Sequence, residues 1–171
     1  MSAQTLNTLL VPDAQATELG DALARVAEEI DGDVRVDSIH RMLYAQDASV
    51  YWEEPLGVVF PRSTEDVQAI VRLADTLGIE LIPRAAGTSL AGQCVGAGLV
   101  VDTGRHMNQI LSIDPEARSA TVQPGVVLDV LNREAATYGF VFGPDTSTSN
   151  RCMIGGMIGN NSCGSHSILY G

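Results

Sequence analysis

The segment Pro83–Gln93, PRAAGTSLAGQ, consists almost entirely of small residues and directly follows an apolar run that is typical of a strand. Arg84 stands at its entry, and Thr88 and Ser89 add hydroxyl groups. Successive backbone N–H groups in such a turn form a concave anion site, and small residues let a phosphate approach to hydrogen-bonding distance. A pyrophosphate would fit this chemistry. A glycine-rich surface turn that serves only the fold is the alternative interpretation of these residues alone.

Two common phosphate-binding signatures are absent from this segment. There is no G-x-x-x-x-G-K-[ST], since the chain contains no lysine, and no G-x-G-x-x-G that opens a helix. A P-loop and a Rossmann site are therefore excluded. A second small-residue region, Gly143–Gly171, combines Gly155, Gly156 and Gly164 with serine and asparagine side chains. Because each glycine costs backbone entropy without adding core contacts, two such regions indicate a long ligand held between two backbone-lined walls.

The spacing of apolar residues predicts the elements that position these two regions. Strand, helix and strand within residues 57–83 have the size of a βαβ crossover, for which a right-handed connection is expected. The mixed order of helices and strands predicts the α+β class. A loose tail is expected over residues 1–15 and irregular short pieces over residues 34–55. The predicted elements are helices over 19–30, 63–78 and 127–139, strands over 57–61, 79–83 and 99–102, and a hairpin over 109–125.

Helix 63–78 has recognisable start and stop signals. Ser63 is the N-cap candidate, Asp66 stands three residues later, and Gly78 is placed to end the helix. Helical spacing gives each of the last two helices an apolar stripe that should face the core. The expected stripes are Val67, Ile70, Val71, Ala74 and Leu77, and then Val127, Val130, Leu131, Ala135 and Tyr138.

Composition excludes several classes of partner. The net charge of −11 would repel polyanions, so neither nucleic acid nor an anionic membrane surface is expected to bind. The N-terminus lacks a secretory signal, and no apolar run approaches the roughly 20 residues of a membrane span. We expect a cytoplasmic protein with reduced cysteines. Scattered spacing predicts no metal site and no disulfide framework for His40, His106, His166, Cys94, Cys152 and Cys163.

The motifs PRAAGTSLAG and GGMIGNNSCG resemble a known family, the vanillyl-alcohol oxidase type (PCMH-type) of FAD-binding flavoproteins. That family carries P-R-G-G-G-T-S-L-x-G and, later, G-G-x-x-x-x-N-x-x-G. The segments FPRSTEDVQAIVRLA, VVDTGRHMNQIL and VQPGVVLDVLNREA are also similar, so the resemblance extends from about Asp47 to Gly171. It is strongest to the branch of glycolate oxidase subunits and D-lactate or D-2-hydroxyglutarate dehydrogenases. STSNRCMIGGMI resembles large bacterial members that join an FAD domain to an iron–sulfur domain.

The resemblance implies a fold, a cofactor and the residues that hold it. The fold would be the first α/β subdomain of the FAD-binding domain and part of the second. Residues 1–46 would form an N-terminal helical extension, and residues 47–171 a domain that is incomplete at its C-terminus. FAD would be noncovalent, because Thr88 stands where some relatives attach it through histidine. Arg84, Ala85, Ala86, Gly87, Thr88, Ser89, Gly92 and Gln93 would hold the pyrophosphate, and Pro144, Asp145, Thr148, Gly155, Gly156, Asn161 and Gly164 would line the second wall.

The resemblance also implies an activity for a longer protein. Such a protein would oxidise a 2-hydroxy acid of the D-lactate, glycolate or D-2-hydroxyglutarate type and pass the electrons to an acceptor that the sequence does not identify. Catalytic residues, and any iron–sulfur cluster, are expected beyond residue 171, so the fragment alone would be inactive. A second hypothesis is a non-enzymatic remnant that binds a phosphate or nucleotide without redox activity. The abrupt apolar end and the replacement of two family glycines by Ala85 and Ala86 motivate it.

Overall fold

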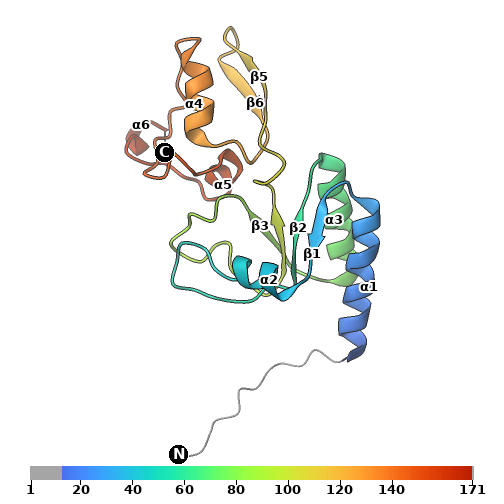
Figure 1. The fold of residues 1–171 in the computed structure, drawn as a ribbon. Coiled ribbons are helices and arrows are strands. Elements are labelled where there is room, and N and C mark those ends of the chain that lie inside the picture. Colours follow the sequence, from blue (N-terminus) through green and yellow to red (C-terminus); the bar gives the residue numbers. More distant parts are fainter. Residues whose placement is uncertain (1–12, 171) are drawn as a thin grey trace, which may run out of the picture.

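A computed structural model describes residues 13–170 (Figure 1). The first part of the described chain is a sheet covered by helices. Its elements are α1 (Asp13–Glu29), β1 (Asp33–Arg35), α2 (Ser38–Tyr44), β2 (Gly57–Phe60), α3 (Thr64–Leu77), β3 (Leu81–Arg84) and β4 (Leu99–Asp102). The sheet order is β1–β2–β4–β3. β2 and β3 both run parallel to β4, and β1 pairs antiparallel with β2. The predicted unit β2–α3–β3 is therefore present, with β4 inserted between its two strands.

Apolar clusters lie on both faces of this sheet. α1 and α3 lie side by side on one face (Figure 1), where Leu23 and Ile70 are buried against Val101. Because alternate residues of a strand point to opposite faces, the neighbouring Val100 joins Phe60 in a second cluster. Continuous burial along β2 and β4 is what a parallel pair covered on both faces requires.

The prediction for α3 is correct in its limits and correct only in part for its buried face, where Ile70 and Ala74 are buried as expected. Ser63 accepts a hydrogen bond from the Asp66 N–H at 3.1 Å, and Gly78 ends the helix in the left-handed conformation with φ 63°. Val71 and Leu77, predicted to be buried, are exposed. The helix is turned so that Asp66 faces inward, beside the apolar residues Ala69, Ile70 and Ala74.

Asp66 is buried because its carboxylate ties two other segments to α3. One oxygen accepts from the Arg62 N–H at 2.8 Å, and the other accepts from the Asp31 N–H at 3.1 Å. Asp66 is only 4% exposed. This carboxylate therefore links the end of α1 to the start of α3.

The second part of the chain contains the predicted hairpin and three helices. Its elements are β5 (Ile110–Asp114), β6 (Ser119–Val122), α4 (Leu128–Ala136), α5 (Ile154–Gly159) and α6 (Ser167–Tyr170). The Asp114 carboxylate accepts from the N–H groups of Glu116 and Ala117 and so shapes the hairpin turn. A compact core of Val126, Leu128, Leu131, Cys152, Ile154 and Met157 joins α4 to α5. Val130 and Tyr138 were predicted to be buried but are exposed, because Leu128 and not Val127 starts the buried face.

The N-terminal third differs most from the expectation. α1 already begins at Asp13, within the predicted tail, and residues 1–12 lie outside the described part. The segment expected to be irregular contains β1 and α2, which is capped by Asp37. β1 is too short to show a period, and α2 buries none of its residues. The boundary between residues 46 and 47 stays a prediction, although β1 belongs to the same sheet as β2.

No helix within residues 13–170 has the length and apolar character needed to cross a membrane.

Replacement of Asp66 by alanine tests the link between α1 and α3. Asp66→Ala removes the acceptor of two N–H groups, so it should lower the free energy of unfolding by about 1–3 kcal/mol. Asp75→Ala, an exposed change on the same helix, is the control and should stay within about 0.5 kcal/mol. Urea unfolding followed by circular dichroism measures both. Equal effects of the two variants would contradict the role given to Asp66.

Candidate functional site

The loop Arg84–Gln93 lies where the parallel strands end. Arg84 is the last residue of β3 and Asp102 the last of β4, and the two are register partners. Thr103 donates its N–H to the Arg84 carbonyl at 3.0 Å and extends the ladder by one bond. Ligands of open α/β sheets bind at this carboxyl edge, beyond the strand ends. The sheet therefore places the predicted loop at the edge where a ligand would be bound.

The backbone of this loop offers unused hydrogen-bond donors. Within residues 13–170, the N–H groups of the five residues from Ala85 to Ser89 donate no hydrogen bond to the protein. Gly87 and Gly92 have φ values of 63° and 73°, a conformation that favours glycine. Ala85 and Ala86 do not adopt it, since they are absent from the non-glycine residues with positive φ. The two alanines therefore cause no backbone strain in this loop.

The guanidinium of Arg84 turns back beneath the loop. Its Nη1 donates to the carbonyl of Gln46 at 2.7 Å and to that of Tyr44 at 3.3 Å. A Cβ added to Gly87 would lie 2.8 Å from Nη2, so the glycine backbone rests directly on the guanidinium. The sequence predicted a direct phosphate contact for Arg84, and the geometry adds a second task, which is to support the loop.

The segment that precedes β2, to which the sequence assigned no motif, holds the middle and the C-terminal end of the loop. Ala48 donates its N–H to the Gly87 carbonyl at 3.0 Å, and the Asp47 carboxylate accepts from the Cys94 N–H at 3.5 Å. The ring of Tyr51 covers Gly92, where an added Cβ would lie 2.7 Å from the ring. Residues 44–51 and the loop therefore form one hydrogen-bonded unit.

Two ionisable groups in this unit have shifted pKa values. Burial alone would raise the pKa of Asp47, but the hydrogen bonds from Ser49 and Cys94 and the charge of Arg84 outweigh it, so this pKa lies below its ordinary value. Burial raises the pKa of the Cys94 thiol, against the opposing charge of Arg84. Asp47 is thus ionised and Cys94 is a neutral thiol near pH 7.

The two predicted walls meet at one place. A Cβ added to Gly156 would lie 3.1 Å from the Ala85 Cβ, so these backbones pack directly against each other. Gln93 donates its side-chain N–H to the side-chain oxygen of Asn160. The side-chain oxygen of Gln93 accepts a hydrogen bond from the Ser89 hydroxyl. The sequence named the neighbouring Asn161, which has φ 49°. A larger side chain at position 156 would separate the walls.

The rest of the predicted second wall forms a separate group. Asp145 and Gly164 make a parallel bridge, and an added Cβ on Gly164 would clash with the Asp145 carbonyl oxygen. Gly155 packs on Pro124, to whose carbonyl it donates at 2.8 Å. The Thr148 carbonyl accepts hydrogen bonds from the N–H groups of Arg151 and Cys152. Among residues 13–170, no hydrogen bond joins Pro144, Asp145, Thr148 or Gly164 to the loop Arg84–Gln93.

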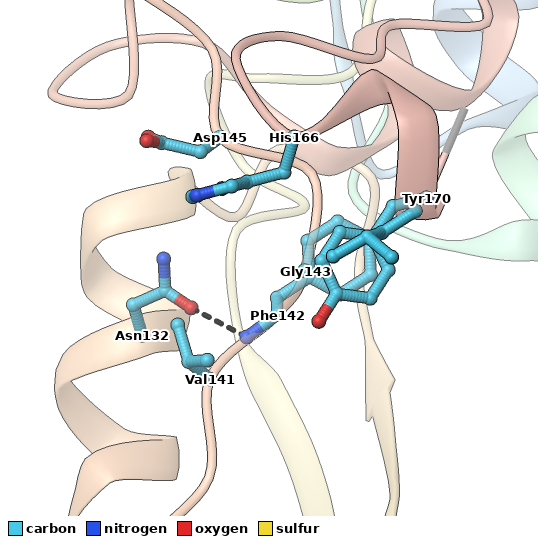
Figure 2. A pocket seen from close by; sticks show the side chains of 8 residues that line it. Asn132, Val141, Phe142, Gly143, Asp145, His166 and Tyr170 are labelled. Atoms are coloured by element: carbon cyan, nitrogen blue, oxygen red, sulfur yellow. Dashed lines mark hydrogen bonds between the residues drawn. The ribbon is translucent and has the colours of Figure 1, made fainter.

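A cavity of about 420 Å³ lies beside this second group. Figure 2 shows the Asn132 amide on α4 pointing toward the imidazole of His166, with the Asp145 carboxylate beyond it. Asn132 Oδ1 accepts from the Phe142 N–H at 2.8 Å, and Tyr170 packs on Gly143. Of the residues predicted for the second wall, only Asp145 lines this cavity, and the loop Arg84–Gln93 does not reach it.

Sequence reasoning missed the residues that support the loop. Tyr44 donates its hydroxyl hydrogen to the buried Asp102 carboxylate at 2.5 Å, across 58 positions of sequence. Asp47 and Tyr51 act on the loop from a segment without helical or strand period. The only signal for them in the sequence was their position between α2 and β2. β2 belongs to the same sheet as β3 and β4, which the loop connects.

Comparison with known proteins assigns the family. Residues 55–171 match the family described as FAD binding domain. The chain is 42% identical to the D-2-hydroxyglutarate dehydrogenase of Pantoea ananatis over 148 residues, which are 85% of this chain and 14% of that protein. It is 37% identical to the glycolate oxidase subunit GlcD of Bacillus subtilis over 77% of this chain and 28% of that protein. The chain therefore spans only a small part of these curated relatives.

Solved structures agree on the fold. An alkyldihydroxyacetonephosphate synthase superimposes with a TM-score of 0.78 at 22% identity, over 89% of this chain and 31% of that chain. A p-cresol methylhydroxylase with substrate bound gives a TM-score of 0.70 at 20% identity, over 85% of this chain and 29% of that chain. These likenesses confirm the predicted α+β fold of the PCMH type as a partial domain. Since the family match covers residues 55–171, the chain belongs to the FAD-binding domain family.

Proposed function

We propose that this chain is the FAD-binding part of a longer flavin-dependent oxidoreductase that oxidises a 2-hydroxy acid of the D-2-hydroxyglutarate, D-lactate or glycolate type. The observation that carries the proposal is the run of five N–H groups over Ala85–Ser89, at the carboxyl edge of the sheet, that have no acceptor within residues 13–170. The proposal is also supported by the 42% sequence identity to a D-2-hydroxyglutarate dehydrogenase. Residues 47–171 would be an incomplete domain after an N-terminal extension of residues 1–46.

The residues of the loop fit a noncovalent pyrophosphate. Five consecutive backbone donors suit the oxygens of a diphosphate, and the Thr88 hydroxyl adds one more, while the Ser89 hydroxyl donates to the Gln93 side chain. Small side chains leave the backbone accessible, and Arg84 adds a positive charge from beneath. Arg84, Ala85, Ala86, Gly87, Thr88, Ser89, Gly92 and Gln93 would hold this part of FAD, while Pro144, Asp145, Thr148, Gly155, Gly156, Asn161 and Gly164 would belong to the second wall.

The chain's own contribution to the reaction is binding and orientation. Oxidation of a 2-hydroxy acid to a 2-oxo acid removes two electrons and two protons, and FAD supplies the two-electron acceptor when it is bound. Backbone donors that are already ordered lose little freedom when they bind an anion, so the loop would fix the cofactor at low entropic cost. Residues that handle the hydroxy acid, the electron acceptor and any iron–sulfur cluster would lie in the remainder of the longer protein.

One of the two observations that suggested the non-enzymatic alternative does not support it. Ala85 and Ala86 suggested a damaged loop, but neither has positive φ, so both fit the loop without strain. The named relatives in the sequence comparison are dehydrogenases and an oxidase subunit. A redox enzyme is therefore the better supported function.

Replacement of Gly87 by alanine tests cofactor binding. In the full-length polypeptide, Gly87→Ala should weaken FAD binding at least about tenfold, because a Cβ strains the left-handed backbone and meets the Arg84 guanidinium. Gly78→Ala is a matched control, since Gly78 has the same φ of 63° and nothing within 4 Å of an added Cβ. FAD is titrated into the apoprotein of each variant, and the change in FAD fluorescence gives the two dissociation constants. Equal affinities in the two variants would argue against the loop as the FAD site.

Anaerobic mixing with hydroxy acids tests the activity. The full-length holoprotein should be yellow and should lose its visible flavin absorbance when D-2-hydroxyglutarate, D-lactate or glycolate is added, because a reduced flavin no longer has that band. Unsubstituted succinate, which has no hydroxyl group to oxidise, is the control. A protein that binds FAD but stays yellow with all three acids would favour the nucleotide-binding remnant.

A further inference from the structure

A buried carboxylate at the end of β4 is the first element of a network beneath the loop. Asp102 is 8% exposed, and both of its oxygens accept hydrogen bonds. Oδ2 accepts from the Tyr44 hydroxyl at 2.5 Å, and Oδ1 accepts from the Gly104 N–H at 2.7 Å. The short hydrogen bond between the Tyr44 hydroxyl and Asp102 Oδ2 holds the end of the tyrosine side chain in place. The link joins the end of α2 to the end of β4.

The ring of Tyr44 then meets the guanidinium of Arg84. Cζ of Arg84 lies 4.9 Å from the ring centroid, within the range of cation–π attraction. The ring of Phe60 approaches the same tyrosine edge-on, with centroids 5.7 Å apart. Tyr44 therefore has little freedom to rotate, because its hydroxyl and its ring are both held.

Arg84 transmits this order to the loop. Its Nη1 donates to the carbonyls of Tyr44 and Gln46, and the Gly87 backbone lies against the guanidinium. The hydrogen bond from Ala48 to the Gly87 carbonyl closes the connection. Displacement of the guanidinium would thus move the middle of the donor run.

We propose that Tyr44 and Asp102 are positioning residues for FAD binding, which act through Arg84 to order the backbone donors of the loop. The inference rests on the proposed function, since it concerns the affinity of the same site. Neither residue needs to touch the cofactor. The free N–H groups bind the pyrophosphate tightly only where the loop is already in place, because an ordered site loses less entropy on binding.

A double-mutant cycle on FAD affinity tests this in the full-length polypeptide. Tyr44→Leu removes the ring and hydroxyl and should raise the dissociation constant of FAD about tenfold, as should Arg84→Met. If Tyr44 acts through Arg84, the double variant should bind no more weakly than Arg84→Met alone, within about twofold. Tyr138→Phe, which changes an exposed tyrosine after α4, is the control and should bind FAD as the wild type does.

A conservative variant keeps the test valid where Tyr44→Leu fails to fold. Tyr44→Phe retains the ring and loses only the bond to Asp102, so it should weaken FAD binding by about threefold while the circular dichroism spectrum stays native. Additive effects of Tyr44→Leu and Arg84→Met, or unchanged affinity in both Tyr44 variants, would overturn the inference while wild-type protein still binds FAD. Wild-type protein that binds no FAD would instead refute the proposed function.

Discussion

The approach of the backbone after β3 to the backbone of α5 is the constraint on which the site depends. Ala85 and Gly156 touch there, and Gly104 lies against the Met153 side chain, so the sheet and the second part of the chain come together through small residues. An added methyl group at Gly104 would lie 2.7 Å from the Met153 sulfur. Because packed interiors have little spare room, the Met153 side chain would have to move to admit such an atom. The abundance of small residues therefore serves the fold as well as ligand binding.

Glycines in the two regions thus have different tasks. Gly164, whose φ is 89°, lies against the Asp145 carbonyl, and Gly155 lies against Pro124, so both serve the second part of the chain. Gly87 and Gly92 are required by positive φ and by the arginine and tyrosine beside them. A sequence motif presents these positions as equivalent. The structure separates those that shape the loop from those that close the backbone elsewhere.

Local chemistry explains what could be predicted from the sequence. The helix limits at Ser63 and Gly78 depend on residues within one turn, and the hairpin at Asp114 depends on its own side chain, so neighbouring residues were enough. The inward turn of α3 was missed because one of the two partners of the Asp66 carboxylate, Asp31, is 35 positions away. The support beneath the loop was missed for the same reason. Long-range hydrogen bonds to buried carboxylates leave no period in the sequence.

The charge of the chain agrees with this arrangement of the site. A net charge of −11 opposes an anionic ligand at long range, but salt screens exposed charges beyond roughly 8 Å at physiological ionic strength. Near the loop, Arg84 supplies one positive charge, which also helps to lower the pKa of the Asp47 carboxyl. Attraction of an anion then depends on this one cation and on backbone dipoles in fixed positions. Such a site selects a ligand by the placement of its oxygens, because its donors are backbone N–H groups in fixed positions.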